Sequence, residues 1–125
     1  MKSIKLIFVL LTSIFISMNA LAHDPKGASF TLSGKVTSIE LSDEGGVINV
    51  SSEAGRYGKV FLTYNVTLNP AVPNQGHFHG RGVGFNDEGV REGGSRQGVF
   101  RREGTIMKFY SLDDVSDGLL NYCET

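Results

Sequence analysis

Two histidines two positions apart are the first residues whose type and spacing suggest a chemistry. His77 and His79 flank Phe78, so in a β-strand both imidazoles lie on one face, where they could share a metal ion. His23 would add a third imidazole and a terminal amine if the chain were cut directly before it. This set predicts a copper or zinc site, and the alternative is a pair of solvated histidines on a polar strand face.

A second set of residues indicates a ligand-binding interior. Tyr64 lies in the clearest alternating segment, 59–68, whose apolar residues are expected in the core: Val60, Leu62, Tyr64, Val66 and Leu68. If Phe100 points inward, period two also carries Arg96 inward, and a buried arginine needs an anionic partner, either an internal carboxylate or a ligand. Tyr64, Arg96 and Phe100 therefore predict a site for a small hydrophobic or anionic molecule, unless Arg96 points outward.

The sequence contains no clear motif of catalytic residues. No serine sits in a Gly-x-Ser-x-Gly elbow, and the single cysteine, Cys123, lies near the end of the sequence. A calcium-loop spacing begins at Asp113, but Val115 occupies its third ligand position, so we interpret this match as coincidence. The sequence favours a binding or structural role over an enzyme.

The first 22 residues read as a secretory signal peptide. Lys2 and Lys5 precede an apolar run, 6–18, and Ala20-Leu21-Ala22 is a small-residue cleavage site. The apolar run is shorter than the roughly 20 residues of a membrane-spanning helix. We therefore expect no membrane insertion, a secreted or periplasmic location, and a single domain over 23–125.

The net charge argues against a nucleic-acid-binding protein, and the cysteine content argues against a core held by disulfides within the chain. Removing Lys2 and Lys5 with the leader leaves 10 basic side chains against 13 acidic ones, a formal balance of −3. A general nucleic-acid-binding protein would show a basic excess, so no nucleic-acid partner is expected. A lone cysteine cannot form a disulfide within the chain, so the core must be stable without one.

Alternation between apolar and polar residues predicts about six strands and no amphipathic helix. The first strand changes phase near Ser38, which suggests a bulge. Residues 113–118 are expected to form a polar turn, and 119–125 either a short last strand or an unpaired end. The expected strands span residues 30–37, 47–51, 59–68, 76–85, 90–102 and 105–112.

This spacing predicts an all-β fold, an antiparallel meander that forms a small up-and-down β-barrel, complete or with one edge left open. The central strand carries Phe78, Gly80, Gly82 and Gly84 on one face. Glycines on an inner face allow the strong coiling that a narrow barrel needs. Their missing side chains either leave room for a ligand or admit large neighbouring side chains.

The glycine and turn spacing also resembles that of known proteins. The segments that carry it are Gly80-Arg81-Gly82, Asp87-Glu88-Gly89, the run from Gly98 to Gly104, and Ser116-Asp117-Gly118. The chain resembles small secreted bacterial β-barrels of uncharacterised function, similar in architecture to the allene oxide cyclase and dirigent barrels. The resemblance implies a barrel that binds hydrophobic or phenolic molecules, and it carries over no catalytic residue.

Three functions are therefore compatible with the sequence. The first is a small exported barrel that binds a small-molecule ligand through Tyr64, Arg96 and Phe100. The second is a periplasmic copper or zinc protein that uses His23, His77 and His79. The third is a structural or interaction module without a pocket. The sequence leaves the oligomeric state open.

Overall fold

The computed structural model describes residues 27–29, 31 and 33–125. The predicted signal peptide and the histidine at position 23 lie outside these residues. In the described part the chain forms seven strands and one 3-10 turn: β1 (Gly34–Ser42), β2 (Gly45–Glu53), η1 (Gly55–Tyr57), β3 (Lys59–Leu68), β4 (Gln75–Phe85), β5 (Arg91–Glu103), β6 (Ile106–Val115) and β7 (Leu120–Glu124).

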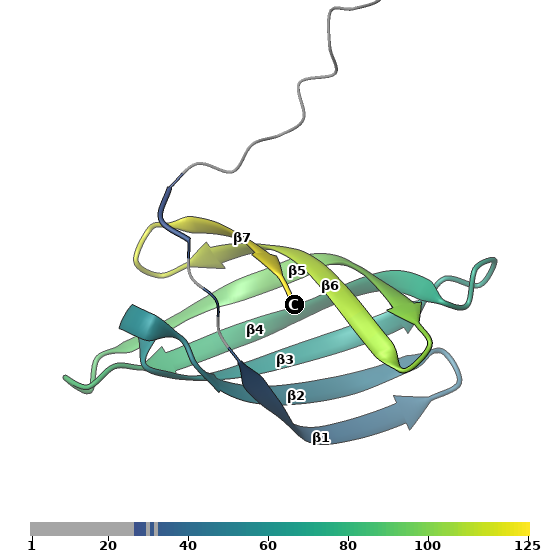
Figure 1. Ribbon diagram of the computed structural model, residues 1–125, viewed down its shortest axis with the longest axis horizontal. Helices are drawn as coiled ribbons and strands as arrows, with labels where there is room; N and C mark the ends of the chain where they lie inside the picture. The colour runs from purple at the N-terminus through teal and green to yellow at the C-terminus, as the bar shows by residue number, and fades with distance from the viewer. Residues whose placement is uncertain (1–26, 30, 32) are drawn as a thin grey trace, which may run out of the picture.

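All the strands belong to one antiparallel sheet (Figure 1). Each strand pairs with the next along the chain, so the order from edge to edge is β1 to β7. This confirms the predicted all-β meander, and the bounds of β3 match the prediction residue for residue. Within the described part, no ladder joins β1 to β7, and the sheet is not closed. No helix there has the length and apolarity that crossing a membrane requires.

Several strand boundaries differ from the sequence prediction. β1 continues past the bulge to Ser42 instead of ending at position 37, and β2 spans Gly45–Glu53 instead of 47–51. Of the two alternatives for residues 119–125, the short last strand is confirmed, because residues 120–124 pair with β6 as β7 and bring the sheet to seven strands. Residues 113–115 continue β6 instead of forming a turn, because their backbone pairs with β5 and β7 and the Asp113 side chain binds Arg96 on the inner face. The turn is therefore shorter and begins at Ser116.

The predicted bulge in the first strand is confirmed. The register between β1 and β2 shifts between Val36 and Ser38, which leaves Thr37 as the extra residue. Phe30 and Leu32, which were expected at the start of this strand, lie outside the described residues.

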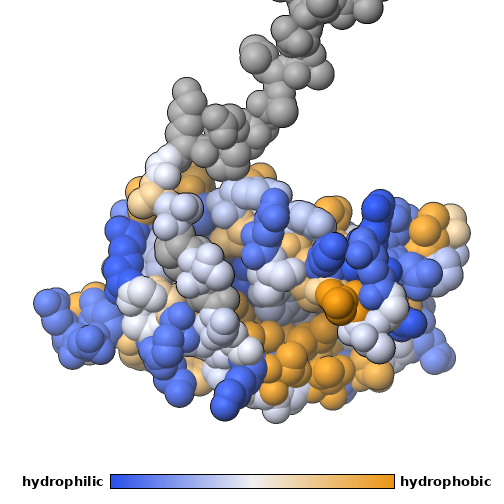
Figure 2. Space-filling view, viewed as in Figure 1, coloured by the Kyte–Doolittle hydropathy of each residue, from blue (hydrophilic) through white to orange (hydrophobic). Residues whose placement is uncertain are grey.

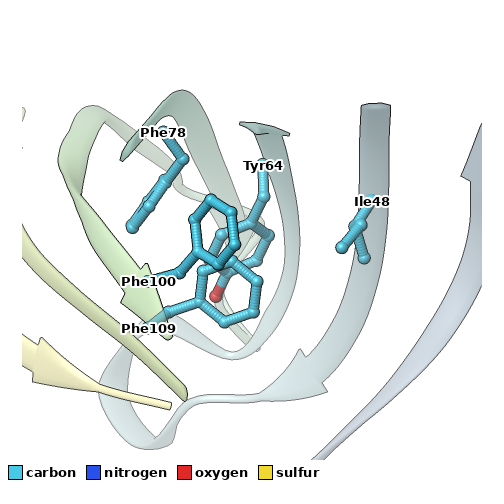
Figure 3. Close-up of a cluster of buried hydrophobic side chains, with 5 residues drawn as sticks. All are labelled: Ile48, Tyr64, Phe78, Phe100 and Phe109. Carbon is cyan, nitrogen blue, oxygen red and sulfur yellow. The ribbon is translucent and has the colours of Figure 1, made fainter. Parts of the chain in front are cut away.

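The sheet is strongly curled, with its apolar face inside. Tyr64 on β3 and Phe109 on β6 have ring centroids 4.7 Å apart, although three strand spacings separate them, about 14 Å in a flat sheet. Phe78 and Phe100 complete the aromatic cluster from β4 and β5, and Ile48 packs against it from β2 (Figure 3). Tyr64, Phe78 and Phe100 are each at most 3% exposed, which confirms the predicted inner face.

Glycines on this face allow the curl. A Cβ at Gly80 would overlap the Thr63 carbonyl oxygen of β3, and one at Gly98 would overlap the Tyr110 carbonyl oxygen of β6. Backbone therefore lies where a side chain would otherwise stand, and adjacent strands approach across the inner face. Gly82 differs, because a Cβ there would meet only side-chain atoms, Leu62 Cδ2 at 3.0 Å and Arg96 Cδ at 3.8 Å.

This contrast predicts unequal effects of two alanine substitutions on one strand. Gly80→Ala should lower the free energy of unfolding by roughly 1–3 kcal/mol or more, because the Thr63 backbone must move. Gly82→Ala should change it by less than about 1 kcal/mol, because the end of the Leu62 side chain can shift. Urea denaturation of both variants measures the difference. Equal losses would contradict the curl at Gly80.

Candidate functional site

A buried polar cluster lies beside the aromatic cluster. Arg96 is 5% exposed, and its Nε donates to Asp113 Oδ2 at 3.0 Å. Its Nη1 donates to the Tyr64 hydroxyl at 2.8 Å and its Nη2 to Ser111 Oγ at 3.2 Å. Ser111 Oγ donates in turn to Asp113 Oδ1 at 2.9 Å. These residues form one hydrogen-bonded network around a buried ion pair, which we call the arginine network.

Strand register explains how the arginine network forms. Tyr64, Gly80, Arg96 and Asp113 are successive partners across β3, β4, β5 and β6, and all lie on the inner face. Gly80 has no side chain, so the Arg96 guanidinium reaches over β4 to the Tyr64 hydroxyl. Asp113 neutralises the guanidinium from the other side. The partner expected for a buried arginine is thus an internal carboxylate.

The network holds Arg96 in its charged form. Burial disfavours the charge, but the electrostatic and hydrogen-bond interactions with Tyr64 and Asp113 outweigh burial and raise the pKa of Arg96 above its usual value. Cys123 on β7 lies next to the same carboxylate, with its Sγ 3.3 Å from Asp113 Oδ2. Burial, then the negative charge of Asp113, raises the pKa of Cys123 to about 11, so near neutral pH it is an unreactive thiol.

A cavity of about 100 Å³ lies next to the arginine network. Gly82 and Gly94, direct partners on β4 and β5, both line it, and the space lies over Gly82, where a Cβ would meet only side-chain atoms. Apolar side chains form much of its wall, with Arg96 and Asp113 at one side. The wall also includes Ala54, Tyr57, Val60, Leu62, Glu92, Val115, Asn121 and Cys123.

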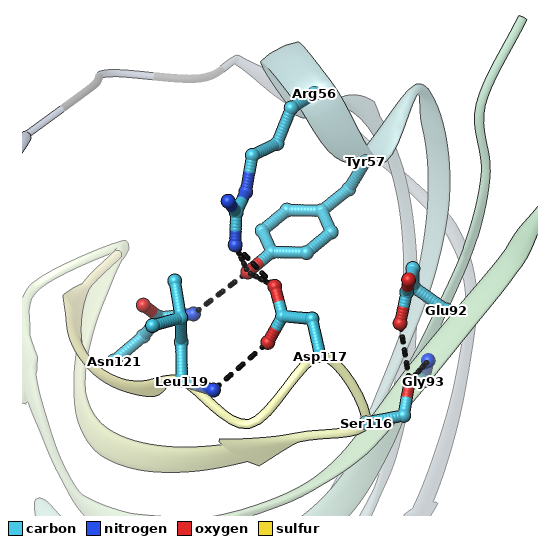
Figure 4. Close-up of polar contacts among 8 residues, drawn as sticks. All are labelled: Arg56, Tyr57, Glu92, Gly93, Ser116, Asp117, Leu119 and Asn121. Atoms are coloured by element: carbon cyan, nitrogen blue, oxygen red, sulfur yellow. Dashed lines mark hydrogen bonds and ion pairs between the residues drawn. The ribbon is translucent and has the colours of Figure 1, made fainter.

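Polar contacts beside the cavity join η1, which lies between β2 and β3, to the turn between β6 and β7 (Figure 4). Arg56 of η1 forms an ion pair with Asp117 in the turn between β6 and β7, and the Tyr57 hydroxyl donates to Asp117 Oδ2 at 2.9 Å. The Leu119 backbone N–H donates to Asp117 and, against the cost of desolvation, lowers the pKa of that carboxyl with help from Tyr57 and Arg56. Asn121 Nδ2 donates to the Tyr57 hydroxyl at 3.4 Å.

A second contact at this end fixes β5 to the same turn. The Gly93 backbone N–H donates to Ser116 Oγ at 3.0 Å, and that hydroxyl donates to Glu92 Oε2 at 2.5 Å (Figure 4). Tyr57, Glu92 and Asn121 all line the cavity. The polar contacts therefore position several wall residues through elements that are far apart in sequence.

The predicted ligand residues divide into three places. Arg96 lines the cavity. Tyr64 is not part of the cavity wall, and its hydroxyl accepts a hydrogen bond from Arg96. Phe100 also lies outside the cavity wall and packs on Phe109 in the aromatic cluster. Sequence reasoning missed Asp113 as their partner because it assigned that residue to a turn. Period two from Phe109 would have carried Ser111 and Asp113 to the inner face.

Two of the three predicted metal residues, His77 and His79, lie on the opposite side of the sheet. His77 and His79 are both exposed and share the outer face of β4, as expected. Their cross-strand partners are Thr67 and Val99 for His77, and Asn65 and Gln97 for His79, none of which is a common metal ligand. Among the residues the structure describes, no three His, Cys, Asp or Glu side chains gather as a metal site. His23, the third predicted ligand, lies outside the described residues.

The chain matches no protein-family model, no curated protein and no solved structure. Its function is therefore inferred from its own geometry.

The arginine network predicts the effect of removing one charge. Arg96→Met should lower the free energy of unfolding by roughly 3–5 kcal/mol, because it leaves the Asp113 carboxylate, 13% exposed, without its cation. Arg96→Met/Asp113→Leu should recover much of this loss, because neither charge then remains buried. Chemical denaturation of both variants provides the measurement. Arg101→Met, an exposed position on the same strand, is the control, and equal losses in Arg96→Met and Arg101→Met would contradict a buried ion pair.

Proposed function

We propose that this chain is an exported small-molecule-binding protein whose curled sheet acts as an incomplete up-and-down barrel, with the ligand in the cavity above Gly82 and Gly94. Export is inferred from the leader-like segment 1–22. The architectural resemblance to allene oxide cyclase and dirigent barrels stays a prediction, and the ligand site is inferred without it.

The main support for this proposal is that a charged hydrogen-bond donor, Arg96, lies at the wall of a mostly apolar cavity. A guanidinium has five N–H groups, and three of those on Arg96 donate to Asp113, Tyr64 and Ser111. Two remain for an acceptor atom on a ligand. A concave apolar surface with a few fixed polar groups is the usual form of a small-molecule site.

The size of the cavity and the charged groups in its wall limit the class of ligand that can bind. The cavity holds about 100 Å³, compared with the roughly 150 Å³ of an enclosed cavity that accommodates benzene in another protein, but it is partly open to solvent, so a compact ligand of about that size can bind with one end exposed. Asp113 already neutralises Arg96, and Glu92 adds a further carboxylate to the wall. An anion would therefore be repelled, and an uncharged molecule with one carbonyl or hydroxyl oxygen fits best. This refines the expected hydrophobic or anionic ligand to a neutral one.

A second candidate function is metal binding at the outer face. One observation favours it: His77 and His79 are exposed and point from the same side of β4. A copper or zinc ion would still need a further ligand, and His23 remains the predicted one.

Cyclopentanone, an apolar ring with one acceptor oxygen, is a suitable probe. Titration into the chain 23–125 should produce saturable NMR shifts of the amides at Gly82, Gly94 and Arg96, whereas cyclopentane should bind more weakly because it lacks the acceptor. Gly82→Val should abolish the shifts with little change in melting temperature, because the added methyl groups occupy the cavity.

Arg81→Ala, on the outer face of the same strand, is the matched control and should bind cyclopentanone like the unmodified chain. Equal binding of the ketone and the hydrocarbon would contradict a role for the Arg96 N–H groups. If neither probe causes saturable shifts, and Gly82→Val only lowers the melting temperature, the interior is filled and the protein is a structural module without a pocket.

A further inference from the structure

Strand β1 differs from the rest of the sheet in its exposure. All nine of its residues are exposed, and it pairs with β2 alone. Its outer edge leaves backbone N–H and C=O groups without a strand partner in the described part of the chain (Figure 1). The Ser33 carbonyl, just before β1, accepts a hydrogen bond from Ser52 Oγ of β2 at 2.7 Å, on the side away from this edge. An edge of this length is a template for another strand.

The bulge gives this edge an apolar face. Val36 pairs with Val50 before the bulge, and Ile39 pairs with Ile48 after it, so both point to the core face despite their odd spacing. Leu41, two residues further, shares that face. Yet Val36, Ile39 and Leu41 are 58%, 56% and 79% exposed. In Figure 2, apolar side chains gather along the margin of the molecule where β1 and β2 lie in Figure 1.

We propose that β1 is a dimerisation edge, and that its partner is β1 of a second copy of this chain, paired antiparallel about a two-fold axis. Residues of the two copies then oppose each other in pairs: Lys35 with Glu40, Val36 with Ile39, and Gly34 with Leu41, each pair occurring twice. The axis passes between Thr37 and Ser38. This inference is independent of the ligand proposed for the cavity.

The sequence of β1 is complementary to itself in this register alone. Lys35 and Glu40 lie on the outer face, opposite Ser51 and Val47 of β2, so the two charges meet on one side of the joined sheet. Val36 and Ile39 meet on the other side, so apolar groups oppose apolar groups. A shift of one residue would place core-face residues opposite outer-face ones, and a shift of two would place Lys35 opposite Ser38 or Ser42.

A two-fold pairing also ends the sheet in a defined way. An isologous contact closes after two copies, whereas β1 of one copy on β7 of the next would continue into an open filament. Strand β7 has only five residues, compared with nine in β1. The longer, self-complementary edge therefore selects a dimer.

Charge reversal tests this pairing without changing the fold, because both charged side chains are exposed. Sedimentation velocity of the chain 23–125 over micromolar to submillimolar concentrations should show a monomer–dimer equilibrium. Lys35→Glu or Glu40→Lys should each raise the dissociation constant roughly tenfold or more, because each creates two like-charge pairs. The double variant Lys35→Glu/Glu40→Lys should restore it.

Mixing the two single variants provides the sharpest outcome. A Lys35→Glu copy has two glutamates at positions 35 and 40, and a Glu40→Lys copy has two lysines, so they should form a heterodimer although neither dimerises well alone. Lys59→Glu, an exposed position on β3, is the control and should leave dimerisation unchanged. A monomer at all concentrations, or a dimer indifferent to both reversals and to mixing, would overturn the proposal. Such results would leave β1 to another occupant, such as the preceding segment 23–33.

Discussion

The contact between Tyr64 and Phe109 is the interaction on which the rest of the structure depends. It brings β3 and β6 together across the inside of the sheet, where a flat sheet would separate them by about 14 Å. Aromatic side chains of this size bury a large apolar area, so they supply the energy that bends the sheet. The glycines between them remove the side chains that would oppose the bend. A seven-stranded sheet can thus form an interior without closing.

The interior is filled unequally, and this follows from where the glycines lie. At Gly80 and Gly98 the space of the missing side chain is taken by neighbouring backbone. The same holds at Gly94, where the Asp114 carbonyl oxygen takes that space, whereas at its partner Gly82 only side-chain atoms lie nearby and a cavity remains. The arginine network lies at the boundary between the aromatic cluster and the cavity. It keeps a charged donor next to an apolar space, an arrangement that a purely structural core does not need.

The strands with strict alternation could be predicted from the sequence. Residues 59–68 place one apolar face inward, and Phe78 with its glycines extends that face, so this part of the core could be predicted from period two, whereas Ile48 and Phe109 were not predicted. The bulge near Ser38 was also visible as a change of phase. The end of β6 was not, because Asp113 and Asp114 have the composition of a turn.

Asp113 belongs to a strand because Arg96 compensates its charge, and Arg96 reaches it through pairing of β5 with β6. Period two from Phe109 indicates only that Asp113 is on the inner face, and the local sequence does not show that a cation faces it there. For the same reason the cavity could not be predicted. It depends on Gly82 and Gly94 being in register, and that register is set by the pairing of two whole strands. His77 and His79 were placed on one face correctly, but what surrounds them is also a matter of register.

The most direct test of this account is the nuclear Overhauser effect between the aromatic rings of Tyr64 and Phe109, measured on the chain 23–125. A curled sheet with ring centroids 4.7 Å apart predicts strong cross-peaks between the two rings. Cross-strand peaks within the β3–β4 and β5–β6 pairs provide the internal control, because a flat sheet would retain them. Their presence without any Tyr64–Phe109 peak would contradict the curl, and with it the enclosed arginine network and the cavity beside it.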